Sequence, residues 1–198
     1  MDSSVFRWIN RFADRTGWAH DFFLNYAKYG IALFAVLLVV AYLEARQSGD
    51  FRAVAGSVWA GGAALVALEV GQLIGGALNR ARPYDAISGV HVLIDKTTDF
   101  SFPSDHATAA GAVAIGLLIT NRRWGSVAAI LAVMMAFTRV YVGAHYLSDV
   151  VAGLVLGGGV AAAGAVLIVP SLTRLVKRLS RTPFGVIIAA PGAPAKEA

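Results

Sequence analysis

The sequence contains no cysteine, and only 15% of its 198 residues are charged. The lack of cysteine excludes disulfides, thiolate metal ligands and a cysteine nucleophile. A soluble globular domain usually carries about 25% charged residues, so the scarcity of charge argues for a membrane protein. A chain of this length forms one domain and leaves no room for a second folded core.

Hydrophobic residues make up 57% of the sequence and gather in apolar segments. The segments are residues 27–45, 53–79, 104–120, 124–141 and 148–170. Because a membrane helix needs roughly 20 predominantly apolar residues, they predict an all-α polytopic membrane helix bundle with about five transmembrane helices. Several segments are short unless their polar ends are counted, which indicates helix ends that reach into a hydrated pocket.

The first 26 residues have a different pattern. Val5, Trp8, Ile9 and Phe12 follow the spacing i, i+3, i+4, i+7, which predicts an amphipathic helix lying at the membrane interface. An ordinary helix packed on the bundle fits the same spacing. The segment lacks the continuous apolar core of a signal peptide, so we expect no cleavage. We predict one membrane domain over residues 1–182, with 1–26 as its interfacial segment, and a C-terminal tail over 183–198.

Polar residues converge on one face of the membrane if the chain crosses it at each segment in turn. They lie at the end of the second segment, at the start of the third, and in the turn between the fourth and fifth. The set is Arg80, Arg82, Ser104, His106, Arg139, His145 and Asp149. Since a hydrocarbon interior penalises each such group, their convergence predicts a functional site.

This combination of guanidinium, hydroxyl, imidazole and carboxylate groups suits phosphoryl transfer. A phosphoryl group spreads negative charge over three oxygens, and its transfer depends mostly on positioning and charge stabilisation. Arginine presents a planar fork that binds two phosphate oxygens. Ser104 precedes a helical run, so its hydroxyl and the free N–H groups at the helix start can bind an anion. With arginines supplying the positive charge, we expect no metal and no other cofactor.

The spacing of His145 and Asp149, four residues apart, brings their side chains together across one helical turn or a tight turn. An aspartate that accepts the N–H of one ring nitrogen leaves the other nitrogen free as a nucleophile. We therefore expect His145 to attack phosphorus, with Asp149 orienting the ring, and water to hydrolyse the resulting phosphohistidine.

Three motifs follow one another along the chain: "RP" at 82–83, "PSDH" at 103–106 and R-x5-H-x3-D at 139–149. Together they resemble the signatures of the type-2 phosphatidic acid phosphatase superfamily of integral membrane lipid phosphatases. The resemblance implies that Arg82 and Arg139 bind phosphate and that Ser104 hydrogen-bonds it. It also implies that His106 protonates the leaving group, and it agrees with the nucleophile and orienting roles inferred above.

The sequence departs from the family signatures at several positions. The lysine of the first signature corresponds to Gly75. Arg80 is the nearest substitute for its phosphate contact, and Gln72 is an alternative. Asp105 replaces a glycine of the second signature, and Thr138 replaces a serine of the third while keeping its hydroxyl.

The stretches "SFPSDHAT", "RARPY" and "KYG" resemble in particular the bacterial undecaprenyl-diphosphate phosphatases. That likeness implies hydrolysis of undecaprenyl diphosphate to undecaprenyl phosphate outside the cytoplasmic membrane. The motif residues contact only the phosphate group of a substrate. A phosphatase for phosphatidic acid or phosphatidylglycerol phosphate is therefore the alternative within the class. A non-catalytic membrane protein that binds anionic lipid through the same basic residues is a second alternative. A soluble haloperoxidase-like enzyme shares related motifs, but the apolar segments argue against it.

The distribution of Lys and Arg predicts the orientation of the chain. Nine lie on the face opposite the polar set and eight on the same face, or six when Arg82 and Arg139 are counted as site residues. The positive-inside rule then places the site on the extracytoplasmic side of the inner (cytoplasmic) membrane. The expected partners are a lipid-linked phosphate and membrane lipids, with no nucleic acid, because a net charge of +5 fits cytoplasmic loops and anionic headgroups.

The sequence leaves the oligomeric state and the roles of two features open. Glu69 interrupts the second segment, where it is either a buried protonated or paired carboxyl or a group near the site. Residues 84–102 form either a lid, a reader of the substrate headgroup or a linker.

Overall fold

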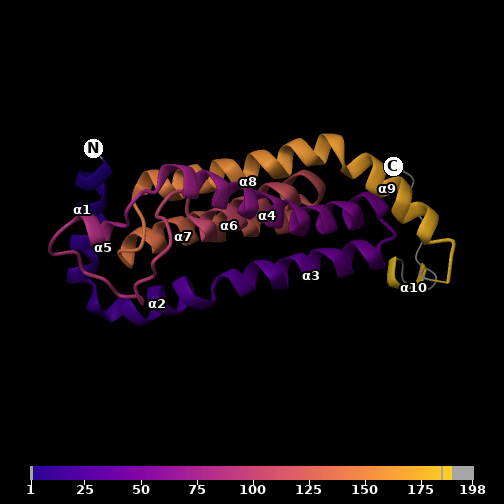
Figure 1. Cartoon of the computed structure of the whole chain (residues 1–198). Helices are drawn as coiled ribbons and strands as arrows, with labels where there is room; N and C mark the ends of the chain where they lie inside the picture. Colours follow the sequence, from indigo (N-terminus) through magenta and orange to yellow (C-terminus); the bar gives the residue numbers. More distant parts are fainter. Residues whose placement is uncertain (1, 184, 189–198) are drawn as a thin grey trace.

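The computed structural model describes residues 2–183 and 185–188, and within these ranges it contains helices and no strand. The long helices run side by side along one axis (Figure 1). They are α3 (Ile31–Gln47), α4 (Phe51–Leu78), α6 (Asp105–Thr120), α7 (Arg122–Tyr141) and α8 (Leu147–Leu167). Helix α6 is the centre of the bundle and packs against α4, α7 and α8. The predicted all-α membrane bundle is confirmed.

Small residues bring α6 and α8 into backbone contact. A Cβ atom at Gly111 would lie 2.6 Å from the carbonyl oxygen of Leu154, and a Cβ atom at Gly157 would overlap the carbonyl oxygen of Thr108. Without a hydrophobic driving force in lipid, such close approach is what holds membrane helices together. The start of α6 also lies beside the start of α8. There the Ser104 amide donates a hydrogen bond to the carbonyl of Asp149 at 3.1 Å.

Three segments are long and apolar enough to cross a membrane by themselves: Phe51–Ala86, Arg122–Tyr141 and Leu147–Leu167. The pair Gly17–Tyr29 and Ile31–Gln47 qualifies as a fourth only together, and it is bent by 58°. Helix α6 is apolar but has only 16 residues. The structure therefore confirms a multi-pass helical bundle but not the count of five spans. Residues 27–29 of the first predicted span belong to the helix before the bend.

One end of the bundle is covered by α1 (Asp2–Arg15), the 3-10 turn η1 (Gly17–Ala19), α2 (His20–Tyr29) and the short α5 (Pro83–Ala86) (Figure 1). The residues of the predicted apolar stripe of α1 differ in their burial. Ile9 is buried, together with Phe6. Trp8 and Phe12 are exposed, with 67% and 46% of their surface accessible. One side of α1 thus packs on the bundle, as in the second reading of the sequence, and the other side presents aromatic residues suited to a membrane interface.

At the opposite end, α8 is followed by α9 (Val169–Leu179) and α10 (Gly185–Ile188) (Figure 1). Pro170, expected at the end of the last span, lies in the first turn of α9, where proline is tolerated. Of the predicted C-terminal tail, residues 184 and 189–198 lie outside the described residues. Glu69 is exposed on α4, on the same side as Leu65 and Leu73, so the buried alternative for this carboxyl is not realised in the single chain.

Candidate functional site

The predicted polar residues meet at the end of the bundle where α4 and α7 end and α6 and α8 begin. Five of them are buried there: Arg82, Ser104, Arg139, His145 and Asp149. The chain reverses between α7 and α8 at Gly143, which has a φ of 83°. A side chain is strained in that conformation, and a Cβ there would also lie 2.7 Å from the carbonyl oxygen of His91. This turn carries His145 into the site.

The hydrogen bonds of His145 define its proton position. Its Nε2 lies 3.1 Å from Nη1 of Arg82, and its Nδ1 lies 2.7 Å from the carbonyl oxygen of Ser101. Because a guanidinium only donates, Nε2 must accept, and the ring proton is on Nδ1. Burial lowers the pKa of His145 to about 4 although Asp149 works to raise that pKa, and the nearby positive charges of Arg139 and Arg82 act in the same direction as burial. The ring is therefore neutral at pH 7, with a lone pair on Nε2.

Asp149 contacts the nucleophile candidate through an intermediary. Its Oδ2 accepts from Ser101 Oγ at 2.6 Å and from the Tyr146 amide at 2.8 Å, while Oδ1 accepts from Arg80 Nη1 at 2.6 Å. Oδ2 lies 3.8 Å from Nδ1 of His145, which is longer than a hydrogen bond. The direct His145–Asp149 bond expected from the spacing is absent. Instead, Asp149 fixes Ser101, and the Ser101 carbonyl orients the imidazole.

Arg82 is held on two sides. Its Nε and Nη2 donate to Asp99 Oδ1 at 3.1 and 2.8 Å, and its Nη1 donates to the Ala144 carbonyl at 3.1 Å besides contacting His145. Partial burial works to raise the pKa of Asp99, but a hydrogen bond from Thr97 and the charge of Arg82 hold that pKa below its usual range. An ionised Asp99 therefore anchors the outer edge of the guanidinium.

Two further donors of the predicted site, Ser104 Oγ and Arg139 Nε, are buried without a hydrogen-bond partner among the described residues, and so is Thr138 Oγ1. Leaving such a group unpaired costs about 1–3 kcal/mol, so an unpaired buried donor calls for a ligand. Ser104 is also the residue before α6, whose first amides and positive end attract an anion. Arg139 also donates from Nη1 to the Ala27 carbonyl at 3.4 Å. Ser104, Arg139 and Arg82 are all buried at this end of the bundle, and a hydroxyl with two guanidinium groups is a donor set suited to a tetrahedral oxyanion.

His106 lies in the first turn of α6 and is half-buried. Its ring is close enough to His145, Arg82 and Arg139 to interact electrostatically with all three. The structure therefore brings His106 to the same end of the bundle as the other predicted site residues.

The loop over residues 87–104 forms one wall of the site. It is tied down by reciprocal bonds between Asn10 and the backbone of His91, at 2.7 and 2.9 Å. The Leu93 amide also donates to the Val142 carbonyl at 3.1 Å. The same loop supplies Asp99 and Ser101, which sequence reasoning missed. Neither residue stands in a spacing pattern that could have revealed it.

The family model of the PAP2 superfamily matches residues 56–173, a range that contains all three motifs. The chain belongs to the PAP2 superfamily. This membership confirms the resemblance inferred from the motifs.

A PAP2 relative from Bacillus subtilis, undecaprenyl-diphosphatase BcrC, is 30% identical over 156 residues, which cover 79% of this chain and 78% of the relative. An undecaprenyl-diphosphatase from Sulfolobus acidocaldarius is 35% identical over 94 residues, covering 47% of this chain and 46% of the relative. The crystal structure of Aquifex aeolicus LpxE superposes with a TM-score of 0.62 at 22% identity, covering 83% of this chain and 93% of that one. The LpxE likeness shows that the fold is shared.

Position 75, where the PAP2 signature has lysine, is closely packed in this chain. A Cβ atom at Gly75 would lie 3.0 Å from the Phe102 carbonyl oxygen and 3.3 Å from Cδ2 of Phe100. Gln72, one proposed substitute, donates to Asp105 Oδ2 at 2.9 Å. The aromatic ring of Phe100 thus covers the place from which a lysine side chain would start.

Arg80, the other proposed substitute, is bound elsewhere. Its Nη1 donates to Asp149 and Ser148, both at 2.6 Å, and its Nη2 donates to Asp2 at 2.5 Å. The guanidinium also lies over the ring of Tyr146, 4.2 Å from its centroid. The structure places Arg80 in an ion-pair network behind Asp149 rather than beside His145, so the expected phosphate contact is not formed in this geometry.

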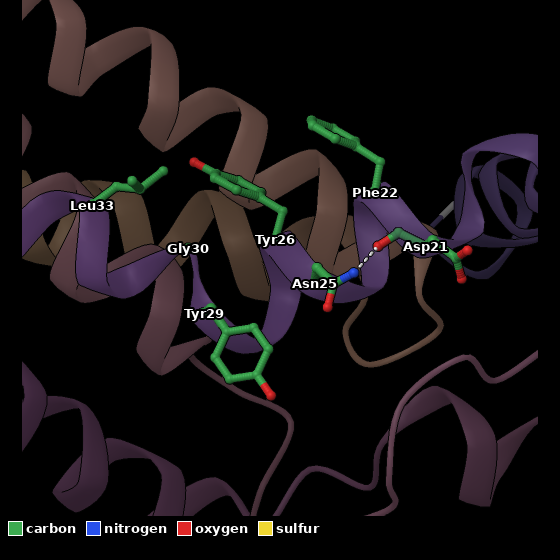
Figure 2. A pocket seen from close by; sticks show the side chains of 7 residues that line it. All are labelled: Asp21, Phe22, Asn25, Tyr26, Tyr29, Gly30 and Leu33. Atoms are coloured by element: carbon green, nitrogen blue, oxygen red, sulfur yellow. Dashed lines mark hydrogen bonds between the residues drawn. The ribbon is translucent and has the colours of Figure 1, made fainter.

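Two further features of the PAP2 chain concern metal binding and a pocket away from the candidate site. Within residues 2–183 and 185–188, no group of three or more His, Asp or Glu side chains is arranged to hold a metal ion. A mostly apolar pocket of about 400 Å³ lies at the bend between α2 and α3 (Figure 2). It is lined by Asp21, Phe22, Asn25, Tyr26, Tyr29, Gly30 and Leu33. None of the candidate site residues contributes to it.

Proposed function

We propose that this membrane phosphatase of the PAP2 superfamily hydrolyses undecaprenyl diphosphate to undecaprenyl phosphate, with His145 as the nucleophile. The observation that carries the proposal is the state of His145. The ring is neutral, its Nδ1–H is fixed on the Ser101 carbonyl, and its Nε2 lone pair faces the Arg82 guanidinium. A phosphate whose oxygens are bound by Arg82 would therefore have its phosphorus next to the Nε2 lone pair.

In the first step, the terminal phosphate binds to Arg82, Arg139 and the hydroxyl of Ser104. Arg82 Nη1 transfers its hydrogen bond from Nε2 to a phosphate oxygen, which frees the lone pair. Nε2 attacks phosphorus, and the bond to the bridging oxygen breaks. His106, which takes up a proton when the negatively charged phosphate binds beside it, gives that proton to the bridging oxygen as undecaprenyl phosphate leaves. The positive charge that develops on His145 is stabilised by Asp149 acting through Ser101.

In the second step, water attacks the phosphohistidine. His106, now neutral, takes a proton from the water as its oxygen bonds to phosphorus, and the bond between phosphorus and Nε2 breaks. Orthophosphate leaves, and both imidazoles return to their starting states. We propose that the guanidinium groups and the positive end of α6 supply the charge stabilisation, so that the reaction needs no metal. Arg80 positions Asp149 and does not touch the phosphate.

The choice of lipid rests on the likeness of "SFPSDHAT" and "RARPY" to the undecaprenyl-diphosphate phosphatases and on the names of the two relatives. We propose that the site faces the extracytoplasmic side of the inner membrane, because more Lys and Arg lie at the opposite face. Phosphatases for phosphatidic acid or phosphatidylglycerol phosphate use the same phosphate chemistry, and they remain the alternative within the class.

The test compares phosphate release by the purified protein from undecaprenyl diphosphate, phosphatidic acid and phosphatidylglycerol phosphate, each in the same detergent. The proposal predicts the highest kcat/KM for undecaprenyl diphosphate and no release by His145→Ala. Equal or faster turnover of a glycerolipid phosphate would overturn the substrate. Turnover by His145→Ala would overturn the nucleophile, and binding of all three lipids without release would favour a non-catalytic lipid-binding protein.

A further inference from the structure

Asp2, in the first turn of α1, contacts the far side of the catalytic network. Its Oδ2 accepts from Arg80 Nη2 and from Ser148 Oγ, both at 2.5 Å, and its Oδ1 accepts from the Ser148 amide at 3.2 Å. Asp2 lies well before residues 56–173, the part of the chain that matches the family model. It was not among the residues that the motifs single out.

Through its contact with Ser148, Asp2 of α1 caps the start of α8. Ser148 is the second residue of α8, and amides in the first turn of a helix have no partner within it. A carboxylate that accepts from such an amide also lies at the positive end of the helix dipole. Asp2 therefore ties α1 to the start of α8, one residue before Asp149.

The contact with Arg80 places one cation between two carboxylates. Arg80 bonds Asp2 with one terminal nitrogen and Asp149 with the other. Asp149 is fully buried, whereas Asp2 and Arg80 are about one-third exposed. Burial works to raise the pKa of Asp2, but hydrogen bonds from Ser148 and Arg80 hold that pKa below its usual range. Asp2 is therefore ionised at neutral pH and holds Arg80 electrostatically.

We infer that Asp2 is a positioning residue for the reaction: it holds Arg80 against Asp149 and so fixes the Ser101 carbonyl that orients His145. The path runs through consecutive contacts, from Asp2 to Arg80, then to Asp149 and to Ser101. Every one of them is charged or charge-assisted, and such bonds are the strong ones. Helix α1 thereby supports the active site. The kinetic part of this inference rests on the proposed function.

Asp2→Asn separates charge from capping, because the amide oxygen can still accept from the Ser148 amide. We expect kcat on undecaprenyl diphosphate to fall about tenfold, the lower end of the roughly 10- to 100-fold losses that follow removal of groups orienting a metal-binding imidazole. KM should be unchanged, because Asp2 does not touch the substrate. Asp2→Glu should restore much of the loss.

Asp14→Asn is the matched control. Asp14 is in the same helix and pairs with His91 at 2.9 Å, away from Arg80. It should keep the wild-type kcat. A wild-type kcat in Asp2→Asn would overturn the inference, and so would an equal loss in Asp14→Asn, which would indicate a general loosening of α1.

A spectroscopic measurement keeps this inference separate from the proposed function. In protein labelled with ¹⁵N-histidine, the Nδ1–H resonance of His145, assigned by its loss in His145→Gln, should shift in Asp2→Asn and stay in place in Asp14→Asn. An unshifted resonance in Asp2→Asn would overturn the coupling. If His145→Ala still released phosphate, the proposed function would fail, while this resonance would still decide whether Asp2 acts on the ring.

Discussion

Replacing Asp149 by asparagine should break one particular interaction of the site, its ion pair with Arg80. The Tyr146 amide can only donate, so the asparagine oxygen must take the place of Oδ2 and keep the bonds from Tyr146 and Ser101. The NH₂ group then takes the place of Oδ1 and faces Arg80 Nη1, 2.6 Å away, donor against donor. The bonds on the His145 side survive, and the charge behind them is lost.

The expected magnitude follows from burial. A hydrogen bond between charged partners contributes about 1.5–3 kcal/mol, and the 31% exposure of Arg80 places this one near the lower end, at about 2 kcal/mol. A double-mutant cycle of Asp149→Asn with Arg80→Gln should therefore give a coupling free energy of about 2 kcal/mol. The activity of Asp149→Asn should fall as well, since the charge that stabilises a cationic His145 is absent.

The assay is reversible unfolding of the purified protein in mixed micelles with increasing SDS, for the wild type, both single variants and the double variant. The free energies of unfolding give the coupling directly. A coupling below about 0.5 kcal/mol, the range in which independent sites simply add, would contradict this prediction. The Arg80–Asp149 contact would then have no energetic role.

Three further predictions concern packing, the missing lysine and pH. Gly157→Ala should destabilise the fold by about 1–3 kcal/mol in the same assay, because its Cβ would overlap the Thr108 backbone, whereas Gly159→Ala, with nothing within 4 Å, should not. Gly75→Lys should lower kcat/KM, since the new side chain must displace Phe100; a gain would show that the family contact can form here. Burial lowers the pKa of His145 from 6.5 to about 4, so the unfolded chain binds this proton first as pH falls. The stability that the neutral ring confers is complete above pH 6.5 and is lost as pH falls toward 4. His145→Gln should flatten that part of the melting-temperature profile, and an identical slope in the variant would contradict the shift.

Hydropathy and spacing predicted where the helices lie in the sequence better than they predicted how consecutive helices are oriented. The apolar run 27–45 was expected as one span, but the chain bends by 58° where α2 meets α3. A Cβ at Gly30, in the bend, would lie 2.8 Å from the Met135 side chain, so the bend depends on packing that hydropathy does not encode. By contrast, the alternation of crossings was enough to bring Arg82, Ser104 and His145 together.

The contacts that complete the site could not be predicted from the sequence. The group that orients His145 is the backbone carbonyl of Ser101, and every residue has one, so no residue type signals it. Arg80 was the nearest cation to the missing lysine. However, α4 ends at Leu78, its C-cap Asn79 has a left-handed φ of 48°, and the path of the chain after it sends the guanidinium to α8. Asp2 is more than 140 positions away from Ser148, beyond the reach of any spacing rule.

If His145 carries the phosphoryl group during turnover, the phosphohistidine can be trapped and identified. The purified protein would be mixed with undecaprenyl diphosphate labelled in its terminal phosphate, quenched in alkali, where phosphohistidine survives, and digested for mass spectrometry. The account predicts a labelled peptide with the phosphate on His145, absent from His145→Ala. Label on another residue, or turnover by His145→Ala, would contradict it.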